Sequence, residues 1–114
     1  MRASVQEIVF DCADPAVLVR FWAELLGGAP VDRSGDWSYV DPPGFTRLAF
    51  QRVPEGKSVK NRLHLDLRVE DPHRAAEETL PLGAARVGGL MKDEQGAFQV
   101  MRDPEGNEFC FVTG

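Results

Sequence analysis

The sequence predicts an α+β fold built from two tandem βαβββ modules, and three observations carry this prediction. The stretch from Arg62 to Val69 alternates polar and apolar residues, which is the period-2 pattern of a half-buried strand. A similar stretch, Val5 to Cys12, precedes Asp14-Pro15 as the later one precedes Asp71-Pro72. A helical pattern then follows each Asp-Pro pair. The chain therefore repeats itself once, with a period of roughly 55 residues.

The two halves can be aligned on these Asp-Pro pairs. The first half reads VFDCADPAVLVRFWAELLGGAPV and the second reads LDLRVEDPHRAAEETLPLGAARV. Each contains a strand, Asp-Pro, a helical stretch, Leu-Gly and a short strand. Further along, Asp41-Pro42-Pro43-Gly44 matches Asp103-Pro104-Glu105-Gly106, and each precedes another apolar run. The repeat indicates a duplicated module rather than a solenoid.

In the first half, the helix is expected to begin after Asp14, which is a good N-cap residue, with Pro15 at the first helical position. Gly27-Gly28 ends it. Its apolar stripe is predicted to pack on the sheet and consists of Val17, Leu18, Phe21, Trp22 and Leu25. The remaining strands are expected at Ala29–Asp32, Trp37–Asp41 and Thr46–Val53.

In the second half, the strand at Arg62–Val69 places Leu63, Leu65, Leu67 and Val69 on a buried face. Asp71-Pro72 is expected to cap the second helix, which runs to about Leu80, and Gly88-Gly89 is expected to form a turn. The later strands are predicted at Ala85–Val87, Phe98–Arg102 and Glu108–Thr113. We expect a single domain over residues 1–114, with module 1 at about 1–53, a linker at 54–59 and module 2 at about 60–114.

Composition excludes several classes of function. The net charge of -5 disfavours a nucleic-acid-binding protein, which usually carries a basic patch. No apolar run approaches the roughly 20 residues that span a bilayer, and no signal-peptide pattern begins the chain, so a cytoplasmic location is expected. Cys12 and Cys110 do not form a disulfide framework, and both lie in apolar runs where a buried thiol is the simpler interpretation.

The stretches DPAVLVRFWAELLG, HLDLRVEDP and DPEGNEFCFV resemble the vicinal oxygen chelate superfamily, specifically its glyoxalase-like group (the glyoxalase/bleomycin resistance/dioxygenase type). The resemblance covers nearly the whole chain. It implies that the two βαβββ modules form a curled, cup-shaped mixed sheet with the helices on its outer face. It also implies a homodimer, because the family commonly pairs modules across chains and long sheet edges need covering.

In metal-dependent members, ligands come from the first and last strands of each module. The resemblance places His64 at one first-strand position and Glu7 at the other, where His or Gln is common. The last-strand positions, usually Glu, fall on Cys110 and on Leu48 or Ala49, with Gln51 on the same expected face as Ala49. The ligand set is therefore degenerate. A divalent metal (Zn, Fe, Mn, Ni or Mg) stays possible through His64, Glu7 and Cys110.

Each candidate residue also has a plainer role. His64 is a ligand, a general acid-base or a structural histidine, and Glu7 is a catalytic group or an exposed strand charge. Arg62, Asp66 and Arg68 either bind an anionic ligand or belong to a solvated sheet face. Candidate apolar pocket walls, with core packing as the alternative, are Trp37, Tyr39, Phe45 and Met101.

Three functions follow from this pattern. The first is a protein that holds a small molecule in the concave sheet, with a degenerate or absent metal site. The second is a lyase, isomerase or dioxygenase that uses Glu7 and His64, with or without a metal. The third is an interaction module with an unused cup. Small-molecule binding ranks first because the familiar ligands are incomplete.

Overall fold

The computed structural model describes residues 1–113, and the chain divides into two compact units between Gly56 and Lys57. Unit 1 contains β1 (Glu7–Cys12), α1 (Pro15–Leu26), β2 (Val31–Ser34), β3 (Trp37–Val40) and β4 (Arg47–Arg52). Unit 2 contains β5 (Asp66–Arg68), α2 (Pro72–Thr79), the 3₁₀-helix η1 (Leu80–Leu82), β6 (Ala85–Asp93), β7 (Gly96–Arg102) and β8 (Glu108–Val112). The predicted two-module α+β fold is confirmed. That the units form one domain stays a prediction.

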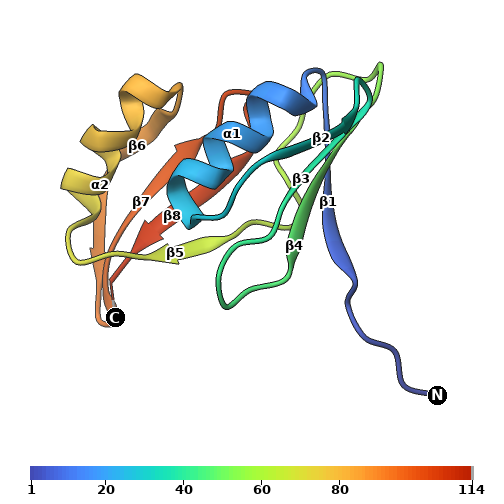
Figure 1. The fold of residues 1–114 in the computed structure, drawn as a ribbon. Coiled ribbons are helices and arrows are strands. Elements are labelled where there is room, and N and C mark those ends of the chain that lie inside the picture. The colour runs from blue at the N-terminus through green and yellow to red at the C-terminus, as the bar shows by residue number, and fades with distance from the viewer. Residues whose placement is uncertain (114) are drawn as a thin grey trace. The chain divides into compact units, whose positions relative to one another are not determined.

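Each unit has a four-stranded mixed sheet with the same topology. The strand orders are β1-β4-β3-β2 and β5-β8-β7-β6. The first and last strands of each unit pair in parallel, and the other pairs are antiparallel. Within its own unit, each helix packs on one face of the sheet (Figure 1). The opposite face of each sheet is therefore free to carry polar side chains.

Helix α1 packs on its sheet through an aromatic core. The Asp14 carboxylate accepts a hydrogen bond from the Val17 N–H, which caps the helix as predicted. Trp22 is almost fully buried, and its ring centroid lies 5.4 Å from that of Phe10, which in turn lies 5.2 Å from that of Phe50. These edge-on and tilted contacts fix the helix over β1 and β4.

Helix α2 is shorter and buries smaller residues. Asp71 caps it by accepting from the N–H groups of His73 and Arg74. Its buried positions are Pro72, Ala76 and Thr79. Because these side chains are small, the apolar volume of the core comes mainly from the sheet, where Met101, Phe109 and Phe111 are buried.

The strand predicted at 62–69 is much shorter in the structure. Only Asp66–Arg68 pair with β8, although the Cys110 N–H also donates to the Leu65 carbonyl. Leu63, predicted to be buried, has 65% of its surface exposed. Before Leu65, the segment contacts β8 through Asn61, whose side chain donates to the Glu108 carbonyl, and not through a continued strand ladder. The alternation of polar and apolar residues over 62–65 therefore does not mark a paired strand, although the Leu65 carbonyl accepts one hydrogen bond from β8.

The predicted turn at Gly88-Gly89 is also wrong. Strand β6 runs through both glycines to Asp93, and the register with β7 shifts between Val87 and Met91. Gly88 has a φ of 70°, which a glycine adopts without strain. The two glycines therefore accommodate an irregularity within the strand, and the chain reverses later, between Asp93 and Gly96.

Candidate functional site

A hollow of about 530 Å³ lies on the sheet face of unit 2 that is opposite α2. Its walls include His64, Asp66, Arg68 and Cys110, with Asp93 and Gln95 from the β6–β7 turn. We call it the β8 hollow. Its volume falls in the range of small-molecule sites, and polar and apolar atoms contribute about equally to its lining.

Strand alternation places these side chains together. Asp66 lies directly opposite Cys110 in the parallel β5–β8 pair, and Arg68 lies opposite Val112. The intervening Phe109 and Phe111 point to the helix side and are buried. Since successive side chains alternate between faces, Asp66, Arg68 and Cys110 must share the open face. His64 joins them from the segment before β5.

The electrostatics of the β8 hollow centre on Asp66. Its Oδ1 lies 3.2 Å from His64 Nε2, and both side chains are about half exposed. Burial raises the pKa of the Cys110 thiol, and the neighbouring Asp66 carboxylate raises this pKa further. Cys110 is therefore a neutral thiol at pH 7 when no cation lies beside it.

The same three residues offer a candidate metal-binding group. One ligand atom each from His64, Asp66 and Cys110 lies within 4.8 Å of the others. Imidazole nitrogen, carboxylate oxygen and thiolate sulfur are all ligands of Zn²⁺ and similar ions. The donor set fits a three-ligand site in which further coordination positions are open. The Cys110 thiol would have to lose its proton when a metal ion binds.

Glu108 holds the segment that leads to His64. Its carboxylate lies 3.0 Å from Lys57 Nζ and accepts from the Asn61 N–H, while its carbonyl accepts from the Asn61 side chain. Burial would raise the pKa of Glu108, but the hydrogen bonds from Lys57 and Asn61 lower it on balance. Glu108 is thus a structural carboxylate that ties residues 57–61 to β8.

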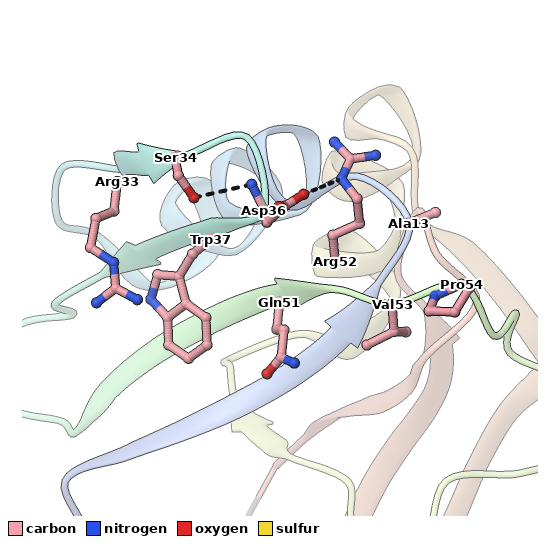
Figure 2. Close-up of a pocket in the computed structure, with 9 residues that line it drawn as sticks. All are labelled: Ala13, Arg33, Ser34, Asp36, Trp37, Gln51, Arg52, Val53 and Pro54. Carbon is pink, nitrogen blue, oxygen red and sulfur yellow. Dashed lines mark hydrogen bonds and ion pairs between the residues drawn. The ribbon is translucent and has the colours of Figure 1, made fainter.

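Unit 1 has its own hollow, of about 820 Å³, which we call the Trp37 hollow (Figure 2). It is lined by Arg33, Trp37, Gln51, Arg52 and Val53 among others. Trp37 and Gln51 lie opposite each other across β3 and β4, so they share a face. The volume of this hollow is also within the range of small-molecule sites.

The structure thus brings some of the predicted residues together in two groups, one in each hollow, and leaves the others elsewhere. Tyr39 and Phe45 line neither hollow, and Leu48 and Ala49 are fully buried. Glu7 is half-buried on β1, opposite Arg47 in the pairing with β4. Arg62 is exposed and lies outside both hollows. Met101, expected as a possible pocket wall, is fully buried on the helix side of its sheet, opposite Phe109. It is a core residue.

Sequence reasoning missed Arg33. Its guanidinium lies over the Trp37 ring, with Cζ 4.7 Å from the ring centroid. The β2–β3 register shifts between Asp32 and Ser34, so Arg33 stands at a bulge. The turn residues Ser34 and Gly35 signal a chain reversal, but no sequence signal fixes the bulge that directs Arg33 toward Trp37.

Comparison with known proteins agrees with this geometry. The profile of the glyoxalase-like domain family matches residues 7–112. The chain belongs to the glyoxalase-like domain family. The resemblance to the vicinal oxygen chelate superfamily is thereby confirmed. No curated protein sequence is significantly similar to this glyoxalase-like chain.

Solved structures show the same fold at low sequence identity. A glyoxalase-related enzyme from Fulvimarina pelagi has a TM-score of 0.75 at 20% identity, covering 97% of this chain and 88% of that one. A glyoxalase/bleomycin resistance protein/dioxygenase family enzyme from Burkholderia phytofirmans has a TM-score of 0.74 at 18% identity, covering 97% of this chain and 98% of that one. The bleomycin-binding protein of Streptomyces verticillus, solved with copper(II)-bleomycin, has a TM-score of 0.63 at 22% identity, covering 100% of this chain and 98% of that one.

Proposed function

We propose that this glyoxalase-like protein binds a small organic molecule on the open faces of its sheets. The β8 hollow carries the proposal, because a histidine, a carboxylate and an arginine converge there in a space of ligand size. The fold supports it, since the structurally similar Streptomyces verticillus protein binds bleomycin. The metal site that the resemblance implies is degenerate, because neither Leu48 nor Ala49 offers a side-chain ligand atom at the position where Glu is usual.

A thermal-shift screen over a broad metabolite panel tests this function. We expect at least one compound to raise the unfolding temperature of the wild type, because a ligand that binds the native state stabilises it. His64→Ala or Arg68→Ala should remove the shift if the compound occupies the β8 hollow. His73→Ala is the matched control, since His73 is an exposed histidine on α2. A panel without any shift would contradict the proposal.

A metal-assisted lyase, isomerase or dioxygenase is the second candidate. The three donor atoms of His64, Asp66 and Cys110 favour it. A bound divalent ion would act there as a Lewis acid on the oxygen atoms of a substrate. His64 can exchange a proton at Nε2, and Glu7 remains a predicted base. Glu7 belongs to unit 1 and His64 to unit 2.

Elemental analysis separates the two candidates. The protein is purified without chelator or affinity metal, beside His64→Ala, Cys110→Ser and the control His73→Ala. Near-stoichiometric metal that is lost in the first two variants and kept in the third would support the enzyme. Metal-free wild type, with a ligand-induced thermal shift, would support the binding protein.

We also propose a homodimer and a cytoplasmic location. Each sheet ends in two edge strands, β1 and β2 in unit 1 and β5 and β6 in unit 2, and such edges are commonly covered in assemblies. Neither described helix has the length and hydrophobicity that a bilayer crossing requires. Light scattering on the purified protein should give twice the chain mass of 12.6 kDa. A monomer mass at micromolar concentration would contradict the dimer.

A further inference from the structure

The Trp37 hollow contains a buried hydrogen-bond donor that lacks an acceptor. Trp37 Nε1 is shielded from solvent and forms no hydrogen bond within residues 1–113. The Arg33 guanidinium lies over the same indole. A guanidinium carries five N–H donors and no acceptor, so Arg33 cannot satisfy the indole N–H. The guanidinium therefore lies over an indole whose N–H donates to no acceptor in the part of the chain that the structure describes.

The charge of this hollow is also unbalanced. Arg52 pairs with the Asp36 carboxylate at 3.1 Å and donates to the Gly35 carbonyl. Figure 2 shows this ion pair set apart from Arg33. For Arg33, the described part of the chain provides the indole contact but no carboxylate. One positive charge in the hollow is thus left for an external partner.

The rest of the lining has room for an apolar group. Figure 2 shows Gln51 beside the Trp37 indole, with Val53 and Pro54 further along the same hollow. The Gln51 side chain is exposed and makes no hydrogen bond to the residues described. Along the hollow, the N–H donors of Arg33 and Trp37 come first, the Gln51 amide next and the apolar side chains last (Figure 2). A ligand with a negatively charged oxygen at one end and an apolar body behind it matches this order.

We propose that the Trp37 hollow binds the carboxylate of a small organic acid, through Arg33 and Trp37 Nε1, with the acid's apolar body extending along the hollow past the indole in the direction of Val53 and Pro54 (Figure 2). The inference rests on the proposed small-molecule binding and assigns a ligand class to the second hollow. A carboxylate fits because its two oxygens can accept from the guanidinium and the indole together.

Calorimetric titration with benzoate, beside its neutral isostere benzamide, tests the proposal. Benzoate should bind the wild type, and benzamide should bind at least about tenfold more weakly because it lacks the charge. Arg33→Gln should weaken benzoate binding by a similar factor. Trp37→Phe, which keeps a ring but removes the N–H, should weaken it several-fold. Arg74→Gln makes the same charge change on α2, outside both hollows, and should bind benzoate as the wild type does.

Equal affinity for benzoate and benzamide, or full benzoate affinity in Arg33→Gln, would overturn the inference. Circular dichroism spectra that match the wild type would show that each variant is folded. Failure of benzoate to bind, beside a metabolite shift that depends on His64, would reject this inference and leave the proposed function standing. No shift by any compound would reject the proposed function as well.

Discussion

Cys110 illustrates how a residue's neighbours set its chemistry. Cysteine reacts as the thiolate, and both burial and the Asp66 carboxylate raise the pKa of the Cys110 thiol. The free protein therefore holds an unreactive thiol in the β8 hollow. A bound cation would reverse this effect, because a positive charge favours the thiolate. The Cys110 side chain would therefore be inert if the protein binds only an organic molecule, and a metal ligand if the protein binds a cation.

We expect Asp66→Asn to speed alkylation of Cys110 by iodoacetamide at pH 8 by about threefold, because removing the carboxylate lowers the thiol pKa. Mass spectrometry of the labelled peptides distinguishes Cys110 from Cys12, which is buried. His73→Ala serves as the control and should leave the rate unchanged. An unaltered rate in Asp66→Asn would show that burial alone controls this thiol.

At the scale of elements, the end of α1 depends on two glycines. Gly27 and Gly28 have φ values of 88° and 93°, in the region that side chains rarely adopt. A Cβ at Gly28 would lie 2.7 Å from the Asp41 carbonyl oxygen and 2.9 Å from a Val40 methyl group. The close approach of this segment to β3 therefore requires glycine at position 28.

Gly28→Ala should lower the free energy of unfolding by at least about 2 kcal/mol, since backbone strain and a steric clash add together. Urea unfolding followed by tryptophan fluorescence measures this change. Gly35→Ala is the matched control, because nothing lies within 4 Å of a Cβ there and its φ is not positive. Equal stabilities of the two variants would contradict the steric argument.

Helix α2 begins at a cap that the sequence predicted. The Asp71 carboxylate accepts from the N–H groups of His73 and Arg74 at 3.0 and 3.3 Å. These donors have no partner inside the helix, so the cap stabilises its first turn. The helix is only eight residues long, which makes it sensitive to that contribution.

Asp71→Ala should destabilise the protein by about 1 kcal/mol, whereas Asp71→Asn should cost much less because its side-chain oxygen still accepts. Thermal unfolding of the three proteins at pH 7 provides the measurement. A loss as large in Asp71→Asn as in Asp71→Ala would mean that charge, not capping, dominates at this position.

At the scale of the whole molecule, the stability of the fold at acid pH depends on a few carboxylates that form ion pairs. Hydrogen bonds from Arg20 and Ser38 lower the pKa of Asp32, and those from Arg47 lower the pKa of Asp41. The pKa of Glu108 is also lowered on balance, by Lys57 and Asn61 against the opposing effect of burial. Each group is ionised more readily in the folded chain, so each stabilises the fold only while it is charged.

Stability should therefore be steady near neutral pH and fall as the pH drops below about 4.5, through the ordinary and then the lowered pKa values of these carboxylates. Urea midpoints between pH 2.5 and 7 test this dependence. Glu108→Gln should lose about 1 kcal/mol at pH 7, and the difference should shrink as the pH falls through the lowered pKa of the wild-type carboxyl. A constant difference at all pH values would contradict the linkage.

The sequence by itself determined the two βαβββ modules, both helix caps and the family, because alternation, Asp-Pro pairs and an internal repeat are local patterns. It also put His64, Asp66 and Arg68 on one face, since strand period sets that face, and the resemblance to the family added Cys110 to the same candidate site.

Only the tertiary structure decided where strand pairing stops and what each hollow contains. Leu63 alternates correctly but is exposed, because β8 pairs only with Asp66–Arg68. Met101 lies in the core because its register with Phe109 turns it toward the helix side. Arg33 reaches Trp37 through a register shift. Pairing, register and bulges depend on contacts between residues far apart in the chain, and local patterns do not encode them.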